Sequence, residues 1–364
     1  MAKIIFIVGS FRQGGFERRI SEFVEWIDHR EIDTEFSVIC QSLKGIHRPN
    51  ISRDKIIYWP FHLLHKLHLF KLEKLATYWR LKSSVPFGKK LILFIGHQAI
   101  LKNIIENEFI KFDKSISIVF NLVNNLEFSP YKKSIYKNLN DCSVIICNSQ
   151  ENSFLMRQAF VDKVSYVPNY YKRIVNESFS CFAKKRSGKI FKIVSCGSLT
   201  KQKGFDYLIG AMSLLAFRGF EVHLTIFGSG VMKNSLCAFA NRKGLKNFEI
   251  IEGEDFKLHR TDYDIFACSS LFEGYPNALL EAQIGGLPAV AFNCQFGPSE
   301  IIVDQYSGIL VKDFSTVSLA QGLEDVIRNY EYFSAHMTEH SKRLVEKHSE
   351  ENSIEKLFNI LLGL

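Results

Sequence analysis

The most informative part of this chain is the stretch SSLFEGYPNALLEA at residues 269–282, followed by GGLP at residues 285–288. Pro276 suits the first turn of a helix, where its missing N–H costs nothing, and the glycine pair can end that helix. Glu273 then lies in the loop before the helix, and Glu281 lies two turns into it. The free N–H groups of the helix N-terminus favour a bound phosphate. A carboxylate beside an anion site must serve another group, such as sugar hydroxyls.

Short apolar runs recur along the chain, with helical patterns between them. They are near-continuous in Val, Ile and Phe, which is typical of strands buried on both faces of a parallel sheet. Strands alternating with helices predict an α/β chain of two doubly wound, Rossmann-like domains. The expected strands are 4–8, 36–40, 91–95, 116–120, 144–147 and 165–167 in the first half, then 191–195, 222–227, 248–251, 264–268, 289–292 and 309–311.

A polar and basic stretch at residues 169–189 indicates the break between the domains. We therefore expect an N-terminal domain at residues 1–170 and a C-terminal domain at residues 171–340. Residues 341–364 carry apolar side chains at helical spacing and predict a final helix.

Composition limits the class of protein. The 364 residues are enough for two domains with their own cores. The apolar run after Met1 is too short for a signal peptide and lacks a cleavage site, and no uninterrupted apolar run approaches the ~18 residues of a membrane span. Eight cysteines are scattered without a C-x-x-C pair or metal-ligand spacing. This pattern favours buried free thiols and a reducing cytoplasm.

The positive charge is unevenly placed. Residues 1–170 hold 24 Lys and Arg against 16 Asp and Glu, a net of +8, whereas the remaining residues hold 22 of each. The whole excess therefore lies in the first half, which predicts an anionic partner for that half.

Residues 55–90 concentrate this excess, with eight Lys and Arg, one acid, and interleaved Tyr and Trp. Such a mixture suits an anionic membrane surface. A long helical excursion packed on its own domain fits equally well. Nucleic acid is disfavoured, because no binding motif accompanies the charge.

Several motifs together are similar to those of retaining glycosyltransferases of family four, also called glycosyltransferases group 1, which have the GT-B fold. The two glutamates resemble the family's glutamate-x7-glutamate signature. The other matching stretches are GSLTKQKGFD (197–206), like the diphosphate-binding loop, GGFER (14–18), like the N-terminal glycine loop, and FGPSEII (296–302), which follows the helix as in many members. The match covers the C-terminal half well, and the N-terminal half only at its first strand and loop.

The resemblance assigns roles to residues of the C-terminal half. Lys203 would hold the leaving diphosphate, Glu281 the nucleotide ribose, and Glu273 the donor sugar near its reacting carbon. The backbone of Gly274, Tyr275 and Pro276 is expected to approach the sugar through its N–H groups, and the glycine allows this close approach. Ser198 stands where the family usually has an arginine, and Lys201 is the nearest substitute. The alternative interpretation is that Lys203 is a solvated lysine of a loop and that both glutamates are solvated charges at the edge of a helix.

The N-terminal half offers fewer candidates. Gly14 and Gly15 follow the first strand and would face the donor, although a plain strand-to-helix turn explains them too. Many members carry a histidine aimed at the reacting centre, whereas here the corresponding strand ends in Asn121. An asparagine can hydrogen-bond a sugar hydroxyl but cannot act as a base. His97 ends the preceding strand. A histidine packed at the end of a strand and a histidine active in catalysis explain it equally well.

No metal is expected. Asp262 and Asp264 match the Asp-x-Asp of another glycosyltransferase fold, but a short carboxylate before a strand is common turn chemistry. The resemblance implies a metal-independent hexosyltransferase that needs no cofactor beyond its co-substrate, a nucleoside-diphosphate sugar that we expect to be UDP-linked.

The resemblance implies GT-B architecture: an acceptor-binding first domain, a nucleotide-sugar-binding second domain, and a last helix crossing back to the first. The acceptor would be a glycan or lipid-linked glycan in bacterial surface polysaccharide synthesis, reached from the cytoplasm at the inner face of the membrane. A nucleotide-sugar epimerase of the same fold and a non-catalytic partner subunit are the alternatives. The epimerase would need acid and base residues in the first domain that the sequence does not reveal.

Overall fold

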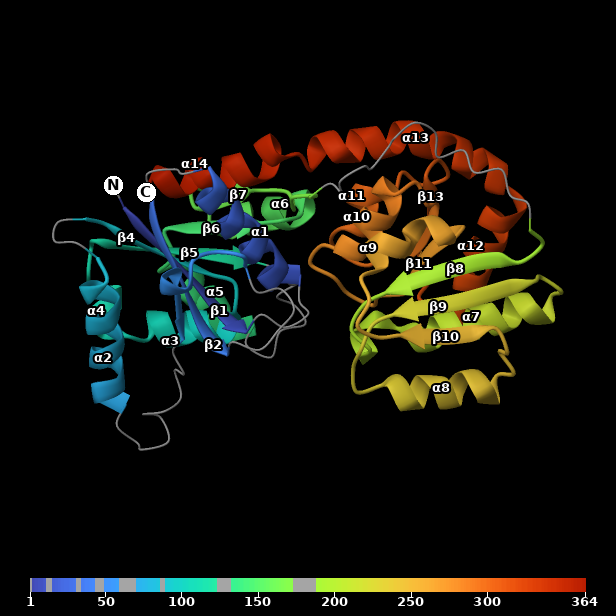
Figure 1. Cartoon of the computed structure of the whole chain (residues 1–364), viewed down its shortest axis with the longest axis horizontal. Helices are drawn as coiled ribbons and strands as arrows, with labels where there is room; N and C mark the ends of the chain where they lie inside the picture. Colours follow the sequence, from blue (N-terminus) through green and yellow to red (C-terminus); the bar gives the residue numbers. More distant parts are fainter. Residues whose placement is uncertain are drawn as a thin grey trace. The chain divides into compact units, whose positions relative to one another are not determined.

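The computed structural model describes residues 2–10, 15–30, 34–42, 49–58, 70–85, 89–122, 132–172 and 188–364. The chain forms two compact units (Figure 1). The first unit comprises Met1–Lys172 together with Ser349–Leu364, and the second comprises Arg173–His348. Each contains one parallel sheet with helices on both faces, as predicted.

The sheet of the first unit has seven strands in the order β3-β2-β1-β4-β5-β6-β7. All the pairings are parallel, and Lys3 of β1 is in register with Glu35 of β2 and Leu91 of β4. The strands are β1 (Lys3–Ser10), β2 (Glu35–Ser42), β3 (Ile56–Tyr58), β4 (Leu91–Ile95), β5 (Ile116–Leu122), β6 (Val144–Cys147) and β7 (Val164–Tyr166).

Side chains of β1 alternate between two cores, because successive residues of a strand point to opposite faces of the sheet. Ile5 and Ile7 pack with one core, and Ile4 and Phe6 pack with the other. The helices are α1 (Gly15–His29), α2 (Phe70–Ser83), α3 (Gln98–Ile105), α4 (Glu108–Lys111), α5 (Lys132–Leu139) and α6 (Gln150–Ala159), with a 3-10 turn at Arg53–Lys55.

The C-terminal segment completes the first unit. A π-helical turn (Glu351–Glu355) leads into α14 (Lys356–Leu362), whose apolar side chains enter the same core as α1. The rings of Phe358 and Trp26 lie edge to face, with their centroids 5.6 Å apart. Arg30, just after α1, forms ion pairs with Glu350 and Glu355. Apolar burial therefore holds this segment on the unit, with charged contacts at its rim.

The sheet of the second unit has six parallel strands in the order β10-β9-β8-β11-β12-β13. They are β8 (Phe191–Cys196), β9 (Val222–Phe227), β10 (Phe248–Ile251), β11 (Ile265–Cys268), β12 (Ala289–Phe292) and β13 (Gly308–Val311). The helices are α7 (Phe205–Phe217), α8 (Lys233–Arg242), α9 (Phe256–His259), α10 (Asn277–Ile284), α11 (Pro298–Ile301), α12 (Thr316–Arg328) and α13 (Tyr330–Lys347), with 3-10 turns at Lys201–Lys203 and Arg260–Asp262.

One large core lies where α7, α8 and α12 cover this sheet. Leu208 and Met212 of α7, with Leu323 of α12, are fully buried in it. On the opposite face α10 packs beside α13. Both faces are thus covered, which explains the continuous apolar strands of the sequence.

Twelve of the strands agree with the prediction to within a few residues at their ends. The sequence analysis missed β3, because its three residues were assigned to the basic, aromatic stretch. None of the helices that the structure describes is both long and apolar enough to cross a bilayer.

Candidate functional site

The second sheet reverses its winding between two neighbouring strands, β8 and β11. From β8 the chain continues outward to β9 and β10, and from β11 it continues outward to β12 and β13. In an open parallel sheet, ligands bind beyond the carboxyl ends of the strands at such a reversal. The residues that follow β8 and β11 therefore form the candidate ligand site of this sheet.

The loops after these two strands are held together by hydrogen bonds. Leu271 N–H donates to the Gln202 carbonyl at 2.8 Å, and the Gln202 side-chain amide donates to the Phe272 carbonyl at 2.9 Å. The Ser269 hydroxyl donates to the Lys203 carbonyl at 2.8 Å. The 3-10 turn Lys201–Lys203 is thus fixed against residues 269–272.

An ion pair joins the same two loops. Lys203 Nζ lies 2.5 Å from Glu273 Oε1. The two side chains are 21% and 8% exposed, respectively. Burial alone would lower the pKa of Lys203, but the charge and hydrogen bond of Glu273 outweigh it and raise that pKa above its ordinary value. Lys203 is therefore protonated at neutral pH, and its contribution to stability is lost only when pH rises through this raised value.

Two glycines allow the loops to approach this closely. Gly204 has φ +56, and a Cβ on it would lie 2.3 Å from the Ser269 carbonyl oxygen. Gly297 has φ +100, and a Cβ there would lie 2.3 Å from Cδ of Pro276. Only glycine fits both the left-handed backbone and the missing space. The FGPSEII stretch therefore lies directly against the EGYP turn.

The helix after this turn differs in detail from the prediction. α10 begins at Asn277, so Pro276 is the residue just before it and not part of its first turn. Glu281 is the fifth helical residue, little more than one turn from the start, and the expected distance of two turns was wrong. Its side chain is buried, with 8% of the residue exposed. Gly285 ends the helix, as expected.

A buried tyrosine–histidine contact anchors the turn, and sequence reasoning did not find it. The Tyr275 hydroxyl lies 2.9 Å from His348 Nε2. His348 is fully buried and Tyr275 nearly so. The two residues are 73 positions apart, and no motif links them. This contact fixes the side chain of Tyr275 and leaves its backbone as the part that can face a ligand.

Cysteines surround the ion pair, as neutral thiols. Burial, followed by the Glu273 charge, raises the pKa of Cys268, although Lys203 opposes the shift. Burial likewise raises the pKa of Cys294. All seven cysteines that the structure describes are free, as predicted. The nearby thiols thus carry no charge at neutral pH.

The remaining predicted site residues are placed as follows. Ser198 is exposed in the loop after β8, and its carbonyl accepts a hydrogen bond from Thr200 N–H at 2.8 Å. Gly274 lies buried between Glu273 and Tyr275. Gly15 is the first residue of α1, whereas Gly14 lies outside the described residues.

Asn121, at the end of β5 in the first unit, is only 2% exposed. Its Oδ1 and the Arg19 Nη1 and Ser353 Oγ atoms are buried and find no hydrogen-bond partner among the described residues. All three residues line a cavity of about 20 Å³, which is room for one water molecule. Burial lowers the pKa of Arg19 to about 10, although Glu22 opposes it. The sugar contact expected of Asn121 stays a prediction.

The acidic and histidine candidates have local partners. Asp264 Oδ2 accepts a hydrogen bond from Lys192 N–H at 2.9 Å, which clips the start of β11 to β8. Asp262 is largely exposed, and no group of three or more potential ligands was found among the residues described. His97 is half exposed, with its Nε2 3.6 Å from a Glu17 carboxylate oxygen.

Residues 179–348 match the sequence model of the family described as Glycosyl transferases group 1. This segment is thus similar to a glycosyl transferases group 1 domain. It contains the Lys203–Glu273 pair, α10 and the Tyr275–His348 contact. The motifs of the second half that carry the resemblance lie within the matched residues.

The similarity to known glycosyltransferases extends beyond residues 179–348. An uncharacterized glycosyltransferase of Methanocaldococcus jannaschii, MJ1059, is 27% identical over 333 residues, which cover 78% of this chain and 77% of that protein. The poly(ribitol-phosphate) alpha-N-acetylglucosaminyltransferase of Staphylococcus aureus is 24% identical over 236 residues, or 64% of this chain, but only 46% of its own length is matched.

A solved structure resembles the chain from end to end. Anabaena Alr3699/HepE, in complex with UDP and glucose, gives a TM-score of 0.76 at 16% identity and is covered completely, as is this chain. At this identity the likeness concerns the fold. It confirms the predicted GT-B class of two Rossmann-like domains with a C-terminal helix.

Proposed function

We propose that the protein is a retaining, metal-independent glycosyltransferase that takes a hexose from a UDP-sugar and places it on a glycan or lipid-linked glycan. The observation that carries the proposal is the Lys203–Glu273 pair beyond the carboxyl ends of β8 and β11. The group 1 domain match supports sugar transfer, and the UDP and glucose named with Alr3699/HepE support the donor class.

The pair supplies both charges that the chemistry needs. A diphosphate leaving group gains negative charge as its bond to the sugar breaks, and a fixed ammonium such as Lys203 stabilises that charge. The diphosphate competes with Glu273 for Lys203. Glu273 is then released to accept hydrogen bonds from hydroxyls of the sugar, whose reacting carbon gains positive character.

For retention we propose attack on the same face of the sugar. The bond between the anomeric carbon and the phosphate oxygen breaks, and the acceptor oxygen bonds to that carbon from the same side. The acceptor proton passes to the departing phosphate oxygen, so that no protein base is needed. This agrees with the absence of a histidine at the position of Asn121.

We propose that the acceptor is borne on a membrane, and an exposed aromatic residue in the basic stretch of the first unit, residues 55–90, supports this. Part of the basic stretch packs on its own unit: Lys74 Nζ donates to the Glu106 carbonyl at 2.6 Å, and Lys82 lies 3.0 Å from Asp113. Residues 59–69 and 86–88 of this stretch lie outside the described residues. Trp79, by contrast, is 61% exposed.

An aromatic patch surrounds this tryptophan. We define it as Trp79 of α2 with Phe109 of α4 and Phe112 just after it, which are 45% and 76% exposed. Tyr78 of α2 packs against α4. Its ring centroid lies 5.7 Å from that of Trp79 and 5.9 Å from that of Phe109. Exposed aromatic rings beside basic residues suit an anionic leaflet. We propose that this patch holds the protein at the inner face of the cell membrane.

Nucleotide affinity tests the donor site. Lys203→Ala and Glu281→Ala should each weaken UDP binding by about 1.5–3 kcal/mol, because each removes a charged hydrogen bond to the ligand. Isothermal titration calorimetry measures this, with Lys243→Ala as the control, an exposed lysine of the same unit. Unchanged affinity in both variants would sink the assignment.

Lys203→Ala also leaves the Glu273 carboxylate without its ion-pair partner, so the melting temperature should fall. Adding Glu273→Gln removes the unpaired charge and should recover part of that loss. If the double variant regains stability but still binds UDP weakly, the loss of binding belongs to Lys203 and not to unfolding.

Turnover tests Glu273. Glu273→Gln keeps a hydrogen-bond acceptor for Lys203 but removes the negative charge, which matters most when the sugar gains positive charge. We expect kcat to fall while the UDP dissociation constant changes little. The measurement is release of UDP from a panel of UDP-sugars with an acceptor present, and full activity in this variant contradicts the role.

Chelation tests metal independence. Because Lys203 supplies the positive charge, transfer should continue in EDTA at its original rate. If EDTA abolishes transfer and Mn²⁺ restores it, the proposal is wrong on this point, and Asp262 returns as a candidate ligand.

Flotation with liposomes tests the aromatic patch. Binding should grow with anionic lipid content and fall with salt, because each basic residue near the leaflet contributes about 1 kcal/mol. It should fall further in Trp79→Ser with Phe112→Ser. Phe217→Ser is the matched control, since this phenylalanine is 91% exposed in the second unit. Protein that stays unbound on anionic liposomes at low salt points instead to a soluble acceptor.

A further inference from the structure

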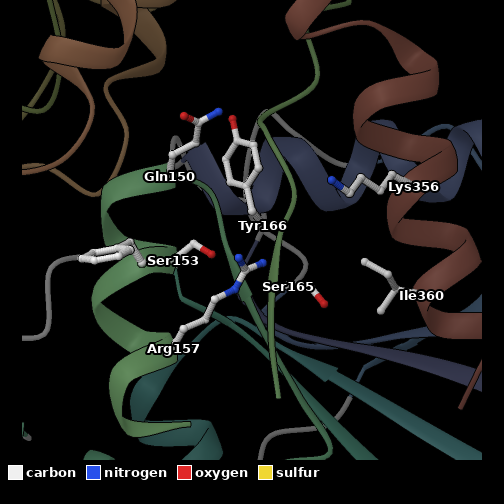
Figure 2. Close-up of a pocket in the computed structure, with 8 residues that line it drawn as sticks. Gln150, Ser153, Arg157, Ser165, Tyr166, Lys356 and Ile360 are labelled. Atoms are coloured by element: carbon white, nitrogen blue, oxygen red, sulfur yellow. The ribbon is translucent and has the colours of Figure 1, made fainter. Parts of the chain in front are cut away.

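A second pocket lies wholly within the first unit, whereas the Lys203–Glu273 pair belongs to the second unit. It has a volume of about 510 Å³, within the range of small-molecule sites. Helix α6, strand β7 and helix α14 form it. Its lining residues are Gln150, Ser153, Phe154, Arg157, Ser165, Tyr166, Lys356 and Ile360. Figure 2 shows the Arg157 and Lys356 side chains reaching in from opposite sides, with Tyr166 and Ser165 of β7 between them.

The pocket is positively charged. Two of its eight lining residues are basic and none is acidic. Neither Arg157 nor Lys356 forms an ion pair with any residue that the structure describes. Glu355, the acid just before α14, is paired with Arg30. Two uncompensated cations in one pocket favour an anionic ligand.

Both cations are positioned by their surroundings. Arg157 Nε donates to the Val164 carbonyl at 3.4 Å, which leaves both Nη groups without a partner among the described residues. Those two groups match the oxygens of a phosphate, which arginine binds with two parallel hydrogen bonds. Lys356 Nζ lies 5.5 Å from the centre of the Tyr166 ring, a cation–π contact that keeps the ammonium at the pocket.

A buried hydroxyl points to the same kind of ligand. Ser153 is only 2% exposed, and its Oγ has no hydrogen-bond partner within the described part of the chain. A buried polar group in this state requires an explanation. Figure 2 shows the Ser153 hydroxyl directed toward the Arg157 side. A ligand oxygen bound to Arg157 would supply the missing partner.

Apolar side chains line the pocket on both helices. Phe154 of α6 lines it and is 66% exposed, and its neighbour Leu155 is 39% exposed. Ile360 lines the pocket from α14, on the opposite side (Figure 2). We propose that this pocket binds the phosphate group of an amphiphilic molecule, with the phosphate on Arg157, Lys356 and Ser153 and an apolar chain against the exposed Phe154. The proposal does not depend on the proposed transfer reaction, because all of these residues belong to the first unit.

Calorimetry with two soluble probes tests the proposal and distinguishes a lipid headgroup from a free phosphate compound. Dihexanoyl phosphatidic acid, below its micelle concentration, should bind at least tenfold more tightly than glycerol 3-phosphate, which has the phosphate but no chain. Equal affinities, or no binding of the phosphatidic acid, overturn the proposal.

Variants locate the binding. Arg157→Ala with Lys356→Ala should lose roughly tenfold or more in affinity for both probes, because charged hydrogen bonds are removed. Phe154→Ser should weaken only phosphatidic acid. Lys102→Ala is the matched control for charge, since this lysine of α3 belongs to the same unit and its side chain is 40% exposed. Thermal melting of each variant shows that it is folded.

The Lys203→Ala variant separates this site from the proposed donor site. It should bind phosphatidic acid as the unmodified protein does, even if it no longer binds UDP. Phosphatidic acid binding that survives in Arg157→Ala/Lys356→Ala, or that disappears in Lys203→Ala, contradicts the pocket assignment.

Discussion

The ion pair between Lys203 and Glu273 is the constraint on which the candidate site depends. It joins the loops after β8 and β11, and hydrogen bonds between residues 202–203 and residues 269–272 hold the same two loops together. A charge with little access to water is costly unless it is paired, so each residue of the pair requires the other while no ligand is bound. In the proposed function, a bound diphosphate would replace one partner and release the other for the sugar. The pair would then supply both charges that the proposed reaction requires.

The fold around this pair explains why it can form. The pair lies at the reversal point of a doubly wound sheet, beyond the carboxyl ends of β8 and β11. Gly204 and Gly297 bring backbone segments closer than any side chain would allow. The Tyr275–His348 contact then fixes the turn that carries Glu273. These are contacts between segments far apart in the sequence, and together they hold two short loops in one arrangement.

Much of the second unit was predictable from the sequence, because the residues that define each of its elements lie close together along the chain. Continuous apolar runs indicate buried parallel strands, and the EGYPNALLEA stretch holds the turn, the helix and both glutamates within ten residues. His348 was not predictable, because its contact with Tyr275 depends on where α13 ends. In the first unit β3 is too short to give a pattern, and the burial of Asn121 beside Arg19 and Ser353 depends on the C-terminal segment that returns to cover it. The pocket between α6 and α14 was not predictable for the same reason, because its two cations, Arg157 and Lys356, lie far apart in the sequence.

A crystal structure of the protein with UDP is the decisive test of the role proposed for the Lys203–Glu273 pair. We expect a diphosphate oxygen within hydrogen-bond distance of Lys203 Nζ, the ribose hydroxyls on the Glu281 carboxylate, and a Glu273 carboxylate that has turned away from Lys203. UDP bound elsewhere, or bound with the Lys203–Glu273 pair intact and untouched, would contradict it.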